Sequence, residues 1–108
     1  MQPAAERLRE HLAGMVLQPP TIAVINNIDV AQETDPARIR DALFRQAYGP
    51  VRWVETIERM QQSGVTHVVE CGPGKVLAGM VKRISPDLSS HALYDPATLA
   101  ETFAFLNA

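Results

Sequence analysis

The chain has 108 residues, of which 46% are hydrophobic and 20% charged, and its formal net charge is −2. This length corresponds to one domain or to part of one. The slightly acidic balance excludes the basic footprint expected for nucleic-acid or membrane-surface binding. The single cysteine excludes an internal disulfide, and no stretch resembles a signal peptide or a membrane span, so we expect a cytoplasmic location.

The first half of the chain predicts helices around one strand. Residues 3–18 repeat apolar side chains at helical spacing and predict an amphipathic helix that ends before two prolines. Residues 21–28 are apolar without alternation, which is typical of a buried central strand. Asp35-Pro36 predicts a helix start, and Gly49-Pro50 separates this helix from a second one that begins near Val51.

The second half is organised around residues 65–77, which predict a short apolar strand, a Gly-Pro-Gly turn and the start of a helix. Gly64 is well placed to cap the helix before this strand. Residues 92–94 predict a third strand, and Asp95-Pro96 predicts the start of the last helix. This order predicts an α/β fold with mostly parallel sheet strands and flanking helices. So narrow a sheet cannot cover all the apolar helix surface, and we infer that the chain packs onto further structure.

The residues by themselves show no complete catalytic site. The turn that contains Gly72 lacks the first glycine and the hydroxyl of a phosphate-binding loop, because Val69 and Val76 stand at those positions. Cys71 could be a nucleophile with a histidine as base, but His67 is too far along the same strand. We expect Cys71 to be a small buried hydrophobic residue instead.

The histidines and the asparagines bear on two further kinds of site. The three histidines and one cysteine lack the spacing of metal ligands, so no metal site is expected. Asn26 and Asn27 follow the predicted strand at its carboxyl end, where open α/β sheets bind ligands. The same two amides could simply satisfy the backbone of a loop, and both interpretations remain open.

Four stretches carry distinctive motifs: residues 24–30, 39–43, 45–53 and 70–77. In this order they resemble the C-terminal part of the malonyl-CoA:acyl carrier protein transacylases, the acyltransferases of bacterial fatty-acid synthesis. The E-x-G-P-G-K-V-L and R-Q-x-Y-x-P-V-x-W patterns together are specific, whereas either alone also fits acyltransferase domains of polyketide synthases. The resemblance covers essentially the whole chain and implies the C-terminal part of an α/β-hydrolase-like acyltransferase core.

The resemblance implies a serine enzyme with a ping-pong mechanism. In such enzymes a Ser in G-H-S-x-G takes malonyl from CoA and passes it to the phosphopantetheine thiol of acyl carrier protein, and a His moves the protons. An Arg binds the malonyl carboxylate. Malonyl-CoA is then the substrate, acyl carrier protein the partner, and no cofactor is required. This sequence contains no G-H-S-x-G, and the family's His and Arg belong to a region that precedes it.

One catalytic role carries over by the resemblance. Gln46 matches the glutamine whose main-chain carbonyl orients the catalytic His in the family. Asn26, Asn27 and Gly72 match segments around the same cleft and are further candidates. Lys82 and Arg83 lie near the end of a predicted helix, and we expect them to dock the acidic carrier protein or to form an ordinary solvated helix face.

Two alternatives remain beside this prediction. One is a stand-alone α/β module that binds carrier protein without catalysis, and the other is a small hydrolase that uses Cys71 and a histidine. In the leading interpretation, the chain supplies residues 1–108 as the C-terminal segment of an acyltransferase domain, and the upstream part of the same enzyme is its partner. The isolated chain is then expected to be inactive.

Overall fold

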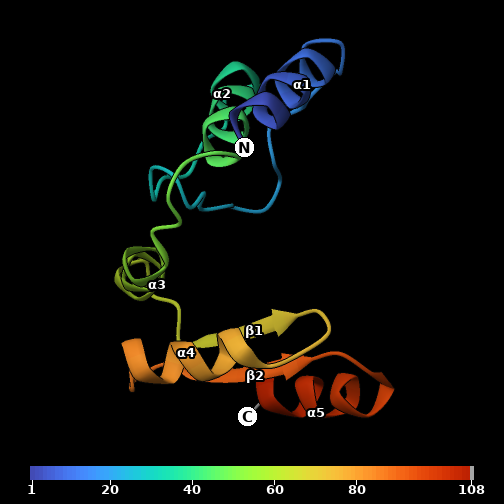
Figure 1. Cartoon of the computed structure of the whole chain (residues 1–108). Coiled ribbons are helices and arrows are strands. Elements are labelled where there is room, and N and C mark those ends of the chain that lie inside the picture. The colour runs from blue at the N-terminus through green and yellow to red at the C-terminus, as the bar shows by residue number, and fades with distance from the viewer. Residues whose placement is uncertain (108) are drawn as a thin grey trace. The chain divides into compact units, whose positions relative to one another are not determined.

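The computed structural model describes residues 1–107 and divides the chain into two compact units, Met1–Thr56 and a second unit from Ile57 onward. Figure 1 shows the elements in chain order. No helix in the described part of the chain is long and apolar enough to cross a membrane. The elements are α1 (Gln2–Ala13), α2 (Pro36–Gln46), α3 (Trp53–Gln62), β1 (His67–Cys71), α4 (Val76–Ile84), β2 (Ser89–Leu93) and α5 (Pro96–Leu106).

In the first unit, α1 packs against α2. Ala5 and Leu12 of α1 and Ala42 of α2 are buried. The Arg40 guanidinium donates to the carbonyl of Leu12 at 3.2 Å and to that of Met15 at 2.8 Å, and so satisfies carbonyls at the end of α1. The helix is shorter than predicted because it ends at Gly14 and not at the prolines.

The predicted first strand is wrong. Residues 21–28 form only an isolated antiparallel bridge between Ile25 and Gln32, and Asn26 N–H donates to the Ala31 carbonyl at 3.0 Å. The physical reason is that a strand requires a partner, and the described part of this unit contains no other extended segment with which to form a ladder. Apolar side chains of this segment remain exposed to solvent, with exposed fractions of 78% for Ile22 and 60% for Val24.

In the second unit, β1 and β2 form a parallel pair in which His67 lies opposite Ser89 and Cys71 opposite Leu93. The α4 helix makes the crossover between them, as parallel strands require. The α/β class with parallel strands is therefore confirmed. The third predicted strand exists as β2, although it begins at Ser89, three residues before the predicted start.

The two faces of this sheet carry different helices. The side chains of Glu70 and Ser90 both bond to the backbone of Ala78 in α4, at 2.9 Å each. The His67 ring packs edge-on against Phe105 of α5, with 4.9 Å between the ring centroids. Because successive side chains point to opposite faces of a strand, α4 covers one face and α5 the other.

Two local predictions have opposite outcomes. Gly64 has φ of +94°, and its N–H and that of Val65 donate to carbonyls of the last turn of α3, so the predicted cap is confirmed. Cys71 is exposed, so the expectation of a buried residue is wrong. The reason is that Cys71 ends β1 at the sheet edge, where the chain turns away into the Gly-Pro-Gly segment.

Candidate functional site

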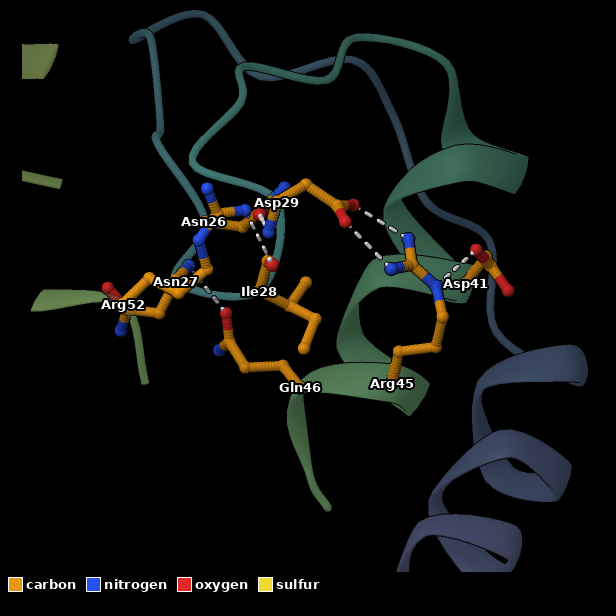
Figure 2. Close-up of polar contacts among 8 residues, drawn as sticks. All are labelled: Asn26, Asn27, Ile28, Asp29, Asp41, Arg45, Gln46 and Arg52. Atoms are coloured by element: carbon orange, nitrogen blue, oxygen red, sulfur yellow. Dashed lines mark hydrogen bonds and ion pairs between the residues drawn. The ribbon is translucent and has the colours of Figure 1, made fainter. Parts of the chain in front are cut away.

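The strongest site candidate lies in the first unit, where the turn of residues 26–29 meets the C-terminal end of α2 (Figure 2). Gln46 is the last residue of α2, and its side-chain Oε1 accepts a hydrogen bond from the Asn27 backbone N–H at 2.9 Å. The carbonyls of Phe44 and Arg45 accept from the two N–H groups that follow the helix, at 3.3 and 3.4 Å. Within residues 1–107, no hydrogen bond ends on the Gln46 carbonyl oxygen. It is therefore a free acceptor at a helix terminus.

The two candidate asparagines hold the turn. Asn26 Oδ1 accepts from the Asp29 backbone N–H, three residues on, at 2.8 Å, which is a local side-chain-to-backbone bond that holds the turn. Asn27 Oδ1 accepts from Thr56 Oγ1 at 3.2 Å, and its carbonyl accepts from Arg52 N–H at 3.2 Å. The structure thus brings both asparagines to Gln46, and each has a structural role in the turn.

Ion pairs surround this turn. Two guanidinium nitrogens of Arg45 donate to the two Asp29 carboxylate oxygens at 2.9 and 2.7 Å, and Arg45 Nε donates to Asp41 at 2.8 Å. The Arg45 bond holds the pKa of Asp29 below its ordinary value, and the Asp29 bond raises the pKa of Arg45. The stabilisation from the Asp29 carboxylate is present above its unfolded pKa and is lost as the pH falls through the lowered folded value. A third ion pair joins Arg52 to Glu55.

Close packing reinforces these contacts. A Cβ atom at Gly49 would lie 2.8 Å from the Arg45 carbonyl oxygen and would overlap the Ile28 side chain. Only glycine permits this approach between the chain that leaves α2 and the turn.

A cavity of about 300 Å³ in the first unit opens beside the turn. Its wall is mainly apolar, and the polar groups come from Gln18, Asn26, Asn27, Glu33 and Gln46. The apolar lining comes from the segment before the turn and from the inner face of α2, and includes Leu17, Pro20, Val24, Ile25, Ile39 and Leu43.

Gly72 lies in the second unit, directly after β1. Its φ is +151°, a region that favours glycine, and its N–H donates to the Leu93 carbonyl at 3.1 Å, which extends the sheet pairing by one bond. Lys82 and Arg83 are exposed in the last turn of α4, and among the described residues neither forms an ion pair.

Sequence reasoning missed Glu70. Its carboxylate accepts from the Ala78 N–H at 2.9 Å and so caps α4, whose own N-cap residue, Lys75, makes no side-chain bond. The contact spans eight residues, and the Gly-Pro-Gly turn that makes it possible was the only available signal.

The cysteine–histidine alternative receives no geometric support. His67 and His91 both pack on Phe105, and no hydrogen bond in residues 1–107 joins a histidine to Cys71. No three histidine, cysteine or carboxylate side chains of the described part gather as metal ligands.

Several known proteins are similar to this chain in sequence and in fold. The chain is 50% identical over 100 residues to the malonyl CoA-acyl carrier protein transacylase of Salmonella typhimurium, covering 93% of this chain and 32% of that protein. The acyl-carrier-protein S-malonyltransferase structure from Burkholderia pseudomallei matches at 57% identity and a TM-score of 0.89, covering 94% of this chain and 33% of its own. A type II PKS acyl-carrier protein in complex with its malonyl-transacylase matches at 46% identity and a TM-score of 0.88, covering 93% of this chain and 32% of the other.

No protein-family model matches the sequence. The chain spans about a third of the length of the relatives that it matches, and this is their C-terminal third. It is thus similar to the C-terminal part of an acyltransferase. The acyltransferases concerned are the malonyl-CoA:acyl carrier protein transacylases, and the resemblance predicted from the sequence motifs is confirmed.

Proposed function

We propose that this chain is the C-terminal segment, residues 1–108, of the acyltransferase domain of a malonyl-CoA:acyl carrier protein transacylase that acts in the cytoplasm in fatty-acid synthesis. The observation that supports this most is the similarity along nearly the whole chain, in sequence and in fold, to such enzymes. The free carbonyl at the end of α2 gives the segment a specific catalytic task.

The reaction has two covalent steps. A serine oxygen attacks the thioester carbonyl of malonyl-CoA, its proton passes to a histidine, and the CoA thiolate leaves as a thiol after it receives that proton. The phosphopantetheine thiol of the carrier protein then attacks the serine ester in the same way. The acyl group is carried by the serine alone, so this scheme requires no cofactor. In this proposal the serine and the histidine come from the part of the complete enzyme that precedes this segment.

This chain contributes the acceptor that holds the histidine. In this proposal the Gln46 carbonyl accepts a hydrogen bond from the histidine Nδ1–H and leaves Nε2 directed at the serine. The Gln46 carbonyl orients the histidine ring through this hydrogen bond. Because a carbonyl is neutral, it stabilises the imidazolium less than a carboxylate does. Asn26 and Asn27 form the adjacent wall of the cavity, and Gly72 is a further candidate for the substrate cleft.

Lys82 and Arg83 are proposed to dock the carrier protein. Carrier proteins are acidic, and these two exposed cations at the end of α4 provide positive charge on a chain with a net charge of −2. One relative of known structure is a malonyl-transacylase bound to its acyl-carrier protein.

The test uses a hybrid enzyme, in which this chain replaces the corresponding segment of the Burkholderia pseudomallei relative. With radiolabelled malonyl-CoA, the hybrid enzyme should form a hydroxylamine-labile serine ester and pass the label to carrier protein. The isolated chain should form none, because it lacks the nucleophile. A folded hybrid that forms no ester would contradict the proposed function, and a label on Cys71 of the isolated chain would favour the hydrolase alternative. Carrier-protein binding by the isolated chain, together with an inactive hybrid, would favour the stand-alone module.

A further inference from the structure

The turn of residues 26–29 is joined to the last turn of α2 by two contacts that the family resemblance did not predict (Figure 2). The first is the Asn27 N–H to Gln46 Oε1 bond of 2.9 Å, and the second is the two-bond Asp29–Arg45 ion pair. We call these two contacts, the Asn27–Gln46 hydrogen bond and the Asp29–Arg45 ion pair, the α2 clamp. The contacts connect residues 16 to 19 positions apart in sequence, so they hold tertiary and not only helical structure.

The two contacts of the α2 clamp leave the helix in different directions, and this restricts the movement of its last turn. Consecutive residues of a helix point about 100° apart around its axis. Because Arg45 and Gln46 are consecutive, the two contacts hold the final turn of α2 from two sides. They therefore oppose both rotation and displacement of that turn. Helix ends commonly fray, and fraying of α2 would displace the Gln46 carbonyl, which is the last one of the helix.

The same guanidinium also makes a bond that does not belong to the clamp. Arg45 Nε donates to Asp41 one turn earlier in α2, at 2.8 Å. This bond lies within the helix and cannot hold the turn of residues 26–29. The molecule therefore contains a matched control, since Asp29 and Asp41 are both partly exposed carboxylates on one arginine.

We propose that Asp29 and Arg45 are positioning residues of the transacylase reaction, which act through the α2 clamp on the main-chain carbonyl of Gln46. This inference depends on the proposed function, because the carbonyl has a catalytic task only in the complete enzyme. Asp29 and Arg45 touch neither substrate nor serine in this scheme. They increase the fraction of molecules in which the carbonyl points along the histidine Nδ1–H bond.

The test compares Asp29→Asn, Arg45→Lys and Asp41→Asn in the hybrid enzyme. Asp29→Asn should lower kcat for ester formation by about fivefold, the factor that a well-formed exposed ion pair supplies, and leave KM for malonyl-CoA within about twofold. Arg45→Lys, which keeps the charge but not the two-bond geometry, should lie between Asp29→Asn and the unmodified hybrid. Asp41→Asn should leave kcat within about twofold.

Two further measurements separate positioning from plain structural support. A weaker carbonyl bond stabilises the imidazolium less, so the histidine pKa falls and the acid limb of the kcat/KM profile should move to lower pH in Asp29→Asn. Hydrogen exchange of the Asn27 amide should accelerate in Asp29→Asn and not in Asp41→Asn.

The failures are distinguishable. An unmodified hybrid that folds but forms no ester overturns the proposed function and with it the positioning role. An active hybrid in which Asp29→Asn and Asp41→Asn give the same kcat and the same pH profile overturns the positioning role alone. Unchanged exchange at Asn27 in Asp29→Asn shows that the ion pair does not hold the turn, whatever the activity.

Discussion

The two units of this chain satisfy their extended backbone in different ways. In the second unit, β1 and β2 pair over five residues each, and a helix covers each face of the sheet. In the first unit, the extended segment before the 26–29 turn has a single bridge, and side chains of α2 and the start of α3 bind the turn instead. Single side chains should therefore matter more in the first unit, where no ladder shares the task.

The largest expected effect comes from Gln46, and it sharpens the comparison. In the hybrid enzyme, Gln46→Pro should lower kcat by about a hundredfold or more, because proline removes a helical N–H bond and costs roughly 3 kcal/mol while it moves the carbonyl. Gln46→Ala retains the carbonyl but loses the bond to the Asn27 N–H, which contributes about 1 kcal/mol, so a fall of about fivefold is expected.

Steady-state kinetics of ester formation measures both variants. Equal and near-total loss in a well-folded Gln46→Ala protein would show that the side-chain amide takes part in the chemistry. Circular dichroism at the assay temperature identifies a Gln46→Pro variant that has merely unfolded.

The second prediction replaces one glycine in each unit by alanine. Gly49→Ala should destabilise the hybrid enzyme by about 1–3 kcal/mol, because the new methyl group meets the Arg45 carbonyl and the Ile28 side chain. Gly79→Ala, within α4, meets no atom within 4 Å and should stabilise by about 0.5–1 kcal/mol. Urea unfolding gives both values. A neutral Gly49→Ala variant would show that the turn adapts and is not rigidly held.

The parts of the fold that the sequence predicts also differ between the two units. The capped starts of α2 and α5, the Gly64 cap and the β1–α4–β2 unit were predictable, because each depends on neighbouring residues. Residues 21–28 were predicted as a strand because they are apolar, but pairing depends on a partner that sequence periodicity does not identify.

The site was predictable only in part. The motif that contains Gln46 indicated its carbonyl, and the helix end makes that carbonyl available. The Asp29–Arg45 pair could not be predicted, because charged residues 16 positions apart have no periodic relation until the turn brings them together. Cys71 was expected to be buried because Val68 and Val69 precede it in β1, whereas its exposure depends on where the strand ends.

The third prediction concerns the proposed docking of carrier protein by Lys82 and Arg83 in the second unit. Lys82→Glu together with Arg83→Glu should raise KM for carrier protein by about tenfold and flatten its salt dependence, because charges at the rim of an interface mainly change association. Malonyl loading from CoA should stay nearly unchanged. The matched control, Arg7→Glu with Arg38→Glu, makes the same change in net charge on exposed residues of the first unit. A similar KM increase in the control would show that net charge alone is responsible.

The smallest expected effect tests the Glu70 side-chain bond that caps the start of α4. Glu70→Gln keeps the shape and an acceptor oxygen but removes the negative charge beside the first turn of α4, so the free energy of unfolding should fall by about 0.5–1 kcal/mol. Glu70→Ala removes the acceptor as well and should cost about 1–2 kcal/mol. Urea unfolding of the hybrid enzyme measures both, and exchange of the Ala78 amide should accelerate more in the alanine variant. Because the β1–β2 ladder remains intact, Glu70→Gln should leave kcat within about twofold. If Glu70→Gln instead lowered kcat tenfold or more with little change in stability, the carboxylate would have a role in catalysis beyond capping α4.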